Sequence, residues 1–196
     1  GQFLGVLDLD VRGGKVQDYR YRLLPVFADL LPADPGMGAL IEASRAPFAE
    51  RLGERLAVSE GLLYRRGNFS GGCDQIILDA LMAETGAEIA FSPGFRWGET
   101  LVPGDTITWE HITNATAITY PNCYRNQMTG TQIKEVLEDV ADNIFHPDPY
   151  FQGGGDMVRM GGMGYAIDVS KPMGSRISAM THLKSGKPIE ASKTYT

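Results

Sequence analysis

Alternating apolar and polar residues open the chain. Residues 5–11 alternate between aliphatic and acidic side chains, and residues 18–23 alternate between charged side chains and tyrosine or leucine. Since every second side chain of a strand lies on the same face, each run predicts a half-buried strand. The segment 12–15, which contains two glycines, predicts the turn between them. The chain is therefore predicted to begin with a β-hairpin.

The hairpin is followed by a change of pattern that predicts a domain boundary. Residues 25–38 contain three prolines and two glycines, which is typical of a connector. From Leu40 to Leu56 the apolar residues follow helical spacing, and Pro47 is expected to kink or divide that helix. The predicted organisation is a hairpin at 1–24, a linker at 25–38 and a second domain at 39–196.

The second domain combines helical and strand patterns without a repeating strand–helix order. The predicted elements are a helix at 74–85 ended by Gly86, a short strand at 88–91, a hairpin-like region at 116–128, a helix that begins at a Thr129–Gln132 capping box and ends before Pro147, and strands over 165–196 with a turn at 185–186. These elements predict an α+β fold with mixed β-sheets and flanking helices.

Composition and charge narrow the class of protein. Hydrophobic residues make up 43% of the chain and charged residues 21%, which is typical of a folded domain. The net charge of -6 argues against a nucleic-acid partner, and no apolar run approaches the roughly 20 residues of a membrane span. The two cysteines, Cys73 and Cys123, are compatible with two separate thiols or with one disulfide in an oxidising compartment.

Three loops that combine glycine with arginine are the candidate chemistry of the chain. They lie at residues 64–72, 91–98 and 151–159. Glycine permits close backbone approach and arginine offers a planar fork for phosphate or sulfonate, so together they suggest an anion-recognising site. The alternative is that these are ordinary turns with solvated charges. The run at 151–165 is the strongest candidate for a ligand loop, but it matches neither a dinucleotide fingerprint nor a P-loop.

Residues that could break a bond are not identified by their spacing. The three histidines, His111, His146 and His182, are scattered and show no metal-ligand spacing. There is no nucleophile elbow, and no nucleophile or general base stands out. The sequence therefore predicts recognition of a substrate without assigning any catalytic residue or metal ligand.

Four motifs give the chain a resemblance to a known family. From about Leu40 the chain contains GGCDQIILDALMAETGAEIAF, LVPGDTITWEHI, MTGTQIKEVLE and GGMGYAIDVSKPMGSRI. In this order they resemble the C-terminal domain of the 5'-nucleotidase family of two-domain hydrolases. The resemblance implies that residues 39–196 are a substrate-recognition domain, continuing beyond the given residues, and that the hairpin ends a metallophosphoesterase domain. It also implies that Gly1 closes a metal-binding Gly-Ser-His-Gly motif.

Other segments depart from nucleotide hydrolases and resemble the thiosulfohydrolases of the Sox sulfur-oxidation system. These segments are FSPGFRWG, ITYPNCYRNQMTG and GGGDMVRMGG. The resemblance implies a periplasmic enzyme that hydrolyses a cysteine-bound S-thiosulfonate on a carrier protein with a swinging arm and releases sulfate. It also implies two manganese ions, with every metal ligand outside this chain. The isolated chain is then expected to be inactive.

The same resemblance implies a set of substrate-binding residues. Arg96 is the expected anion contact, and the other expected residues are Trp97, Tyr120, Asn122, Gly155, Asp156 and Arg159. For Asp156 a local turn-forming bond is the alternative role. Two other functions remain open: a fragment of a 5'-nucleotidase or sugar-nucleotide phosphohydrolase, and a docking module without a catalytic role. The absence of a late Gly-Gly-Asp-Gly loop after Ser178 argues against a complete nucleotide site.

Overall fold

The α+β class predicted from the sequence is confirmed. The structure is a computed structural model that describes the chain except for residues 1, 28–29, 66, 68, 95–97 and 118–121. Contacts between residues divide the chain into two compact units, Gly1–Glu50 and Arg51–Thr196. The predicted domain limits at residues 24 and 39 stay a prediction.

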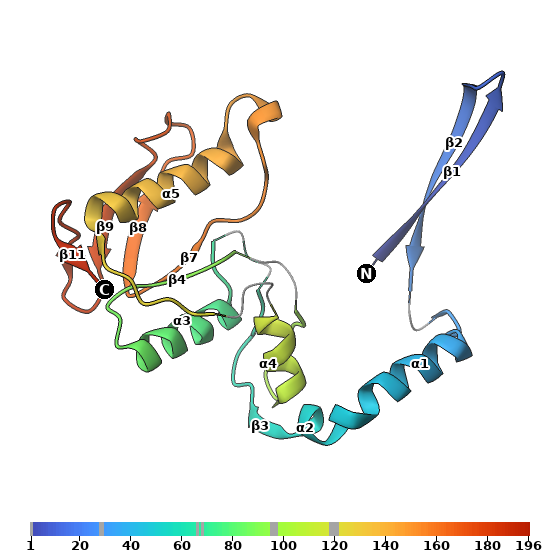
Figure 1. The fold of residues 1–196 in the computed structure, drawn as a ribbon, viewed down its shortest axis with the longest axis horizontal. Coiled ribbons are helices and arrows are strands. Elements are labelled where there is room, and N and C mark those ends of the chain that lie inside the picture. The colour runs from blue at the N-terminus through green and yellow to red at the C-terminus, as the bar shows by residue number, and fades with distance from the viewer. Residues whose placement is uncertain (1, 28–29, 66, 68, 95–97, 118–121) are drawn as a thin grey trace. The chain divides into compact units, whose positions relative to one another are not determined.

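The first unit begins with the predicted hairpin. Strands β1 (Gln2–Arg12) and β2 (Lys15–Val26) pair antiparallel, with Leu7 opposite Tyr21 (Figure 1). The prediction of a half-buried ribbon does not hold within this unit, because Leu7 and Tyr21 are 55% and 57% exposed. Two strands alone cannot cover their own apolar faces, so this ribbon depends on other contacts for stability.

A helix follows the hairpin earlier than predicted. Helix α1 (Pro35–Arg45) begins inside the predicted connector, because Asp34 caps it by accepting a hydrogen bond from the backbone N–H of Met37 at 2.7 Å. Proline suits the first helical position, since its missing N–H would have no partner there. The predicted division at Pro47 is confirmed, with a 3₁₀ turn (Ala46–Phe48) separating α1 from α2 (Ala49–Gly53).

The second unit contains three longer helices and several short strands. Its elements are β3 (Arg55–Val58), α3 (Gly72–Thr85), β4 (Ala90–Ser92), β5 (Thr106–Thr108), α4 (Trp109–Thr116), β6 (Met128–Thr129), α5 (Gly130–Phe145), the 3₁₀ helix η3 (Pro149–Phe151), β7 (Arg159–Gly161), β8 (Met163–Ile167), β9 (Ile177–His182), β10 (Lys187–Pro188) and β11 (Thr194–Tyr195). Every pairing of these strands among the described residues of the second unit is antiparallel: β10–β9–β8, β11–β6, β3–β5 and β4–β7.

The two strongest predicted helices are confirmed. Helix α3 ends at Gly86, as predicted. Helix α5 begins with a capping box, in which Thr129 accepts from the backbone N–H of Gln132 and the Gln132 side chain accepts in return, and it ends before Pro147. The ends of these helices were predicted correctly because each end depends on residues that are close in sequence.

Two other predictions of secondary structure were wrong, and one helix was not predicted at all. The predicted hairpin at 116–128 is not formed by its described part: residues 122–127 have no regular structure, and β6 pairs with β11 near the end of the chain. Helix α4 was not predicted, because its first turn is capped by an unusual partner, the His111 side chain, which accepts from the N–H of Thr108 at 3.0 Å. Leu56, expected on a helix, lies in β3.

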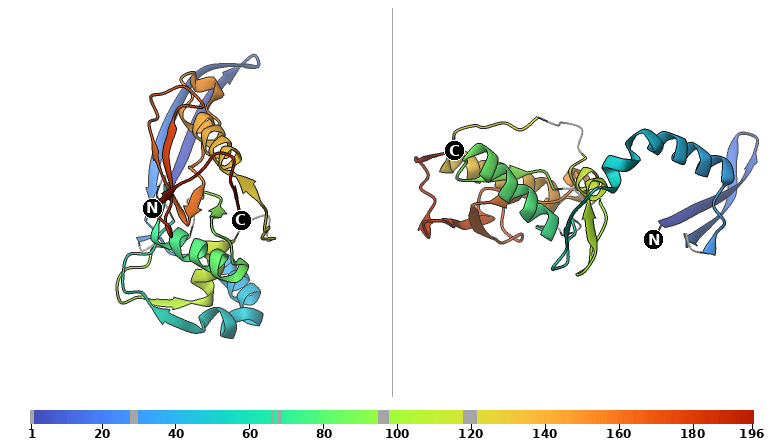
Figure 2. Two further views of the ribbon diagram at one scale, coloured as in Figure 1. Left: turned by 90° about the vertical axis from the view of Figure 1, so that its left-hand side faces the viewer. Right: turned by 90° about the horizontal axis from the view of Figure 1, so that it is seen from below.

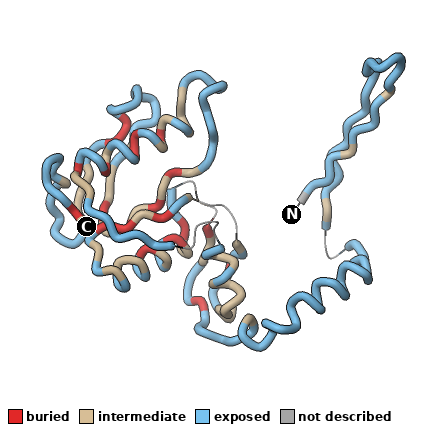
Figure 3. The backbone as a smooth tube through the Cα atoms, in the orientation of Figure 1, coloured by how far each residue is buried: buried red, intermediate tan, exposed pale blue. Residues whose placement is uncertain are grey.

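The core of the second unit lies between α5 and the strands beside it. Strands β4 and β7 run between α3 and α5, and the buried residues concentrate there (Figures 1, 2 and 3). On α5, Leu137 and Ala141 are fully buried against Met157, Met163 and Ile177. Full burial of one large aliphatic side chain contributes about 1.5–3 kcal/mol, so this cluster is a main source of stability.

A buried carboxylate also fixes α5 to β9. Glu138 accepts hydrogen bonds from the backbone N–H groups of Gly174, Arg176 and Ile177 at 2.8, 3.2 and 2.7 Å, and its side chain is 4% exposed. A charged acceptor satisfies three donors that would otherwise be buried without partners. The loop that leads into β9 is therefore held by one residue of α5.

We predict that Glu138→Gln lowers the free energy of unfolding of the chain by about 2–3 kcal/mol, because an amide lacks the charge and turns an N–H₂ toward backbone donors. Urea unfolding checks this, with Glu135→Gln, an exposed position on the same helix, as control. Equal stability of the two variants would contradict the assigned role.

Candidate functional site

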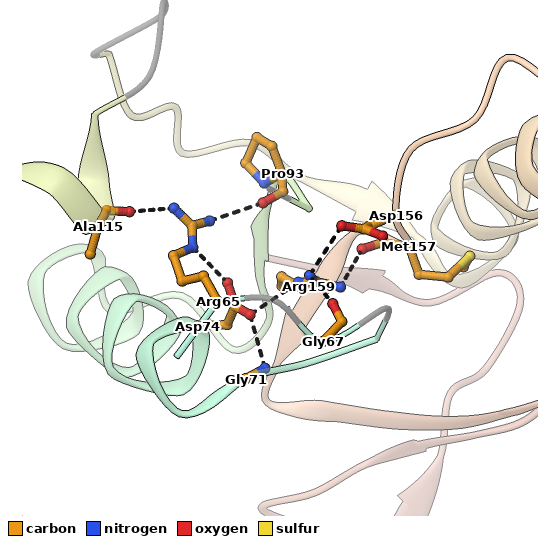
Figure 4. A network of polar contacts seen from close by, with 9 residues as sticks. All are labelled: Arg65, Gly67, Gly71, Asp74, Pro93, Ala115, Asp156, Met157 and Arg159. Carbon is orange, nitrogen blue, oxygen red and sulfur yellow. Dashed lines mark hydrogen bonds and ion pairs between the residues drawn. The ribbon is translucent and has the colours of Figure 1, made fainter. Parts of the chain in front are cut away.

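The candidate site is built around one carboxylate at the start of α3. Asp74 is fully buried in the first turn of this helix, and its Oδ2 accepts from the N–H of Gly71 at 2.9 Å. A negative side chain is favourable there, because the first N–H groups of a helix lack partners. Oδ1 accepts from Nε of Arg65 at 2.9 Å, and Oδ2 lies 3.1 Å from Nε of Arg159 (Figure 4). Asp74 thus joins two buried arginines.

Arg65 uses its remaining nitrogens to hold two other segments. One Nη donates to the carbonyl of Ala115, at the end of α4, and the other donates to the carbonyl of Pro93 at 3.2 Å. These segments lead toward residues 118–121 and 95–97. Only 3% of Arg65 is exposed, so its guanidinium is enclosed by protein groups.

Arg159, the first residue of β7, holds a second pair of segments. Its nitrogens donate to the carbonyl of Met157 at 3.2 Å and to the carbonyl of Gly67, and one Nη lies 3.7 Å from a carboxylate oxygen of Asp156. Its Nε makes no hydrogen bond of good geometry, so the contact with Asp74 is an ion pair. The guanidinium is fully buried.

These four side chains form a charge-balanced network, which we call the Asp74 network: Arg65, Asp74, Asp156 and Arg159. Two positive and two negative groups are removed from water together. Burial of ions is costly unless each charge is paired and its hydrogen-bonding groups are satisfied. The carbonyls of Pro93, Ala115, Met157 and Gly67 supply those partners. The network therefore ties parts of all three predicted glycine–arginine loops to the start of α3.

Close backbone contact reinforces this convergence. A Cβ added to Gly94 would lie 2.5 Å from the carbonyl oxygen of Met157 and 2.8 Å from Cβ of Asp156. Such distances are too short for any side chain, so only glycine allows the 92–94 segment to lie against the 156–157 segment. This is the close approach that the glycine content of the loops predicted.

An apolar pocket of about 430 Å³ opens beside the network. Its lining residues are Phe91, Ser92, Pro93, Gly94, Met128, Val136, Val140, Asp156 and Val158. Asp156 lies both in this lining and in the network. A second hollow, of about 530 Å³, is lined by Gly98, Glu99, Asn114 and Ala117. A pocket with the first lining suits an uncharged organic group better than a free anion, which would meet apolar walls and a carboxylate.

The structure places the predicted substrate residues in different surroundings. Asp156 and Arg159 belong to the Asp74 network, where Arg159 does not reach solvent. Gly155 is exposed in a left-handed conformation, with φ of 99°, that other residues rarely adopt. Asn122 is exposed and lies outside the helices and strands. Arg96, Trp97 and Tyr120 lie outside the described residues. The roles of all seven stay predictions.

Sequence reasoning missed the residue that organises the site. Asp74 was included only as the start of a helix, and Arg65 only as part of a glycine–arginine loop. An acid three residues after Gly71, in the first turn of a helix, is a recognisable capping signal. Nothing in the spacing, however, connects Asp74 with Arg159, which is far away in the sequence.

Metal binding has no evident place in the described part of the chain. Among those residues no group of three or more His, Cys, Asp or Glu side chains could hold an ion.

Cys73, half-buried, and Cys123, exposed, are both free thiols, so the two-thiol alternative describes this structure. No helix among the described residues has the length and apolar character needed to cross a membrane.

Burial next to the network changes two titrating groups. Burial raises the pKa of the Cys73 thiol and the neighbouring Asp74 raises it further, while Arg65 lowers it. Burial also raises the pKa of the Tyr165 hydroxyl, against a smaller lowering by Arg159. Both groups are therefore held in their neutral forms near neutral pH.

Comparison with known proteins identifies the relatives of this fold. The sequence model described as "5'-nucleotidase, C-terminal domain" matches residues 60–196. No curated protein matches the chain.

Solved structures match over the whole chain. Sulfate thiohydrolase SoxB from Thermus thermophilus, in complex with glycerol, is 39% identical with a TM-score of 0.88, and the chain covers 36% of it. A 5'-nucleotidase precursor, also from Thermus thermophilus, is 20% identical with a TM-score of 0.74, and the chain covers 39% of it. A putative 5'-nucleotidase from Staphylococcus aureus, in complex with alpha-ketoglutarate, is 20% identical with a TM-score of 0.57, and the chain covers 40% of it. The two matches at 20% identity show the fold alone.

We predict that Asp74→Asn lowers the free energy of unfolding by about 3–5 kcal/mol, because it leaves two buried guanidiniums without their shared counter-charge. Chemical denaturation measures this, and Asp79→Asn, exposed on the same helix, is the control. A loss below about 1 kcal/mol, the range of a surface substitution, would show that the network is not a buried ionic unit.

We also predict that thiol reagents distinguish the two cysteines. At about pH 8, Cys123 reacts at least about tenfold faster than Cys73, because Cys73 is half-buried and its pKa is raised. Timed alkylation followed by peptide mapping measures both rates, and a Cys123→Ser variant retains only the slow reaction. Equal rates would contradict the described surroundings of Cys73.

Proposed function

Because the chain belongs to the family of 5'-nucleotidase C-terminal domains, we propose that it is the substrate-recognition part of a thiosulfohydrolase. The observation that carries this proposal is the 39% identity with sulfate thiohydrolase SoxB over the whole chain, against 20% with the two 5'-nucleotidases. The proposed substrate is a cysteine-bound S-thiosulfonate on a carrier protein. The chain spans about a third of SoxB, so the activity belongs to the longer enzyme.

The proposed reaction is a hydrolysis at the terminal sulfonate. The oxygen of water forms a bond to the sulfonate sulfur, and the bond between that sulfur and the next one breaks. The electron pair leaves with the inner sulfur, so the carrier retains a persulfide anion. Sulfate and two protons are released, and no oxidant or reductant is needed.

The described residues support recognition in this reaction. The pocket beside Asp156 is apolar, so it suits the organic part of a carrier arm, while the anionic end needs another contact. Arg96 is the proposed anion contact, with Trp97, Tyr120 and Asn122 beside the substrate. The exposed backbone at Gly155 leaves room for an extended arm to pass. Orientation of the substrate is how this chain contributes to rate.

The proposed metal ions lie outside this chain. Two manganese ions remain part of the proposal for the whole enzyme, but the described residues present no cluster of ligands that fits them. We therefore assign no chemical step of a metal to any residue of this chain. A carrier protein with a cysteine-bearing arm is the proposed partner, and the periplasm is the proposed location.

Two other functions are distinguished by experiment. A nucleotide phosphohydrolase would use the same fold, and the apolar pocket could hold a base. A docking module without a catalytic role would bind the carrier without affecting turnover.

We predict that the full-length enzyme releases sulfate from the thiosulfonate-loaded carrier with a kcat/KM at least about 100-fold above its release of phosphate from a nucleoside monophosphate. Arg96→Ala lowers sulfate release by about 100-fold if it is the anion contact. Ion chromatography of sulfate and a phosphate assay measure the two products. Arg125→Ala, which removes an exposed arginine, is the control.

The opposite preference, with phosphate released faster than sulfate, would overturn the thiosulfohydrolase in favour of the nucleotidase. Full turnover by the enzyme without residues 51–196 would favour the docking module. Unchanged sulfate release by Arg96→Ala would remove Arg96 from the site without affecting the assigned reaction.

A further inference from the structure

The two arginines of the Asp74 network hold different pairs of segments. Arg65 contacts the carbonyls of Pro93 and Ala115, whereas Arg159 contacts the carbonyls of Gly67 and Met157. Both arginines are buried, with 3% of Arg65 and 0% of Arg159 exposed. Apart from the carboxylates of Asp74 and Asp156, their partners are backbone carbonyls, so each arginine fixes the course of the chain.

From this division we propose that Arg65 and Arg159 are positioning residues with separate tasks. Arg65 sets the 92–94 segment against the 114–117 segment, and Arg159 sets the segment at Gly67 against 155–158. Asp74 couples the two arginines by sharing one carboxylate between them. This inference rests on the proposed function only in treating these segments as the walls of the substrate site.

The geometry predicts that lysine does not take over the contacts of either arginine. A guanidinium offers five N–H donors in a rigid plane, so it binds Asp74 and two carbonyls at the same time. Lysine keeps the charge beside Asp74 but has a single nitrogen, which cannot reach partners on opposite sides. A lysine variant therefore preserves the ion pair and releases the segments, which separates positioning from charge balance.

Asp156 connects the Asp74 network with the apolar pocket. It lines the apolar pocket and lies 3.7 Å from an Nη of Arg159. The segment that Arg159 fixes is thus a wall of the pocket. Arg65 reaches an adjoining part of the wall through Pro93, which also lines the pocket. Two adjoining parts of the pocket wall are consequently held in place by two buried arginines.

Hydrogen exchange of the lysine variants tests the proposal. In Arg65→Lys, we expect amide exchange to rise about tenfold or more in peptides covering 92–94 and 114–117, with little change at 155–158, because only the first pair loses its anchor. Arg159→Lys gives the reverse pattern. The control is Arg176→Lys, which replaces a buried arginine outside the Asp74 network that binds Asp142 and the carbonyl of Phe145.

Arg65→Lys tests the role of Arg65 and Arg159→Lys tests the role of Arg159. If one variant does not fold, the other still tests its own part of the proposal. A rise in exchange spread evenly over all four segments would mean a general loss of stability, and it would overturn the separate tasks. Unchanged exchange in the anchored segments would overturn positioning altogether.

Kinetics of the full-length enzyme give a second readout. We expect Arg65→Lys to raise KM for the loaded carrier about tenfold with kcat within about twofold, because a displaced wall weakens binding more than chemistry. Arg176→Lys leaves both unchanged. Equal effects of Arg65→Lys and Arg176→Lys on KM would overturn the assignment. If the wild-type enzyme releases no sulfate, the proposed function fails, while the exchange pattern still decides the positioning roles.

Discussion

The placement of the loops in this domain depends on one buried carboxylate. Asp74 completes the first turn of α3, accepts a hydrogen bond from Arg65 and faces Arg159, all without contact with water. A carboxylate can accept several donors in different directions, which a neutral side chain of this size cannot. Because the helix fixes Asp74 and Asp74 fixes the arginines, the rigid part of the fold determines where the loop backbones lie.

The sequence predicts elements whose ends are local. The capping box at Thr129, the glycine after α3 and the proline inside the α1–α2 region each act within a few residues, and the helix start, helix end and division that they set were predicted correctly. The region 116–128 was misread because β6 pairs with Thr194 and Tyr195, which no local pattern reveals. Helix α1 begins before the predicted residue 40, because Asp34 and Pro35 together start it.

For the candidate site, the sequence pointed to the three loops that the Asp74 network joins but could not give the direction of their side chains. Three loops with glycine and arginine suggested forks that face an anion. In the structure Arg65 and Arg159 face inward, toward backbone carbonyls. Three of these carbonyls belong to residues that are 28 to 92 positions away in the sequence. Such contacts exist only after the chain has folded, so residue spacing cannot distinguish an arginine that binds a ligand from one that holds the loops.

The charge balance of the network also limits how this domain can change over evolutionary time. Loss of any one of its four charged residues leaves an uncompensated charge in the protein interior. A tolerated substitution therefore requires a second, compensating change at the same time. Exposed positions such as Asn122 and Tyr124 carry no such requirement. Substrate specificity can therefore change at exposed loop positions by single substitutions, while the four residues of the Asp74 network can change only together.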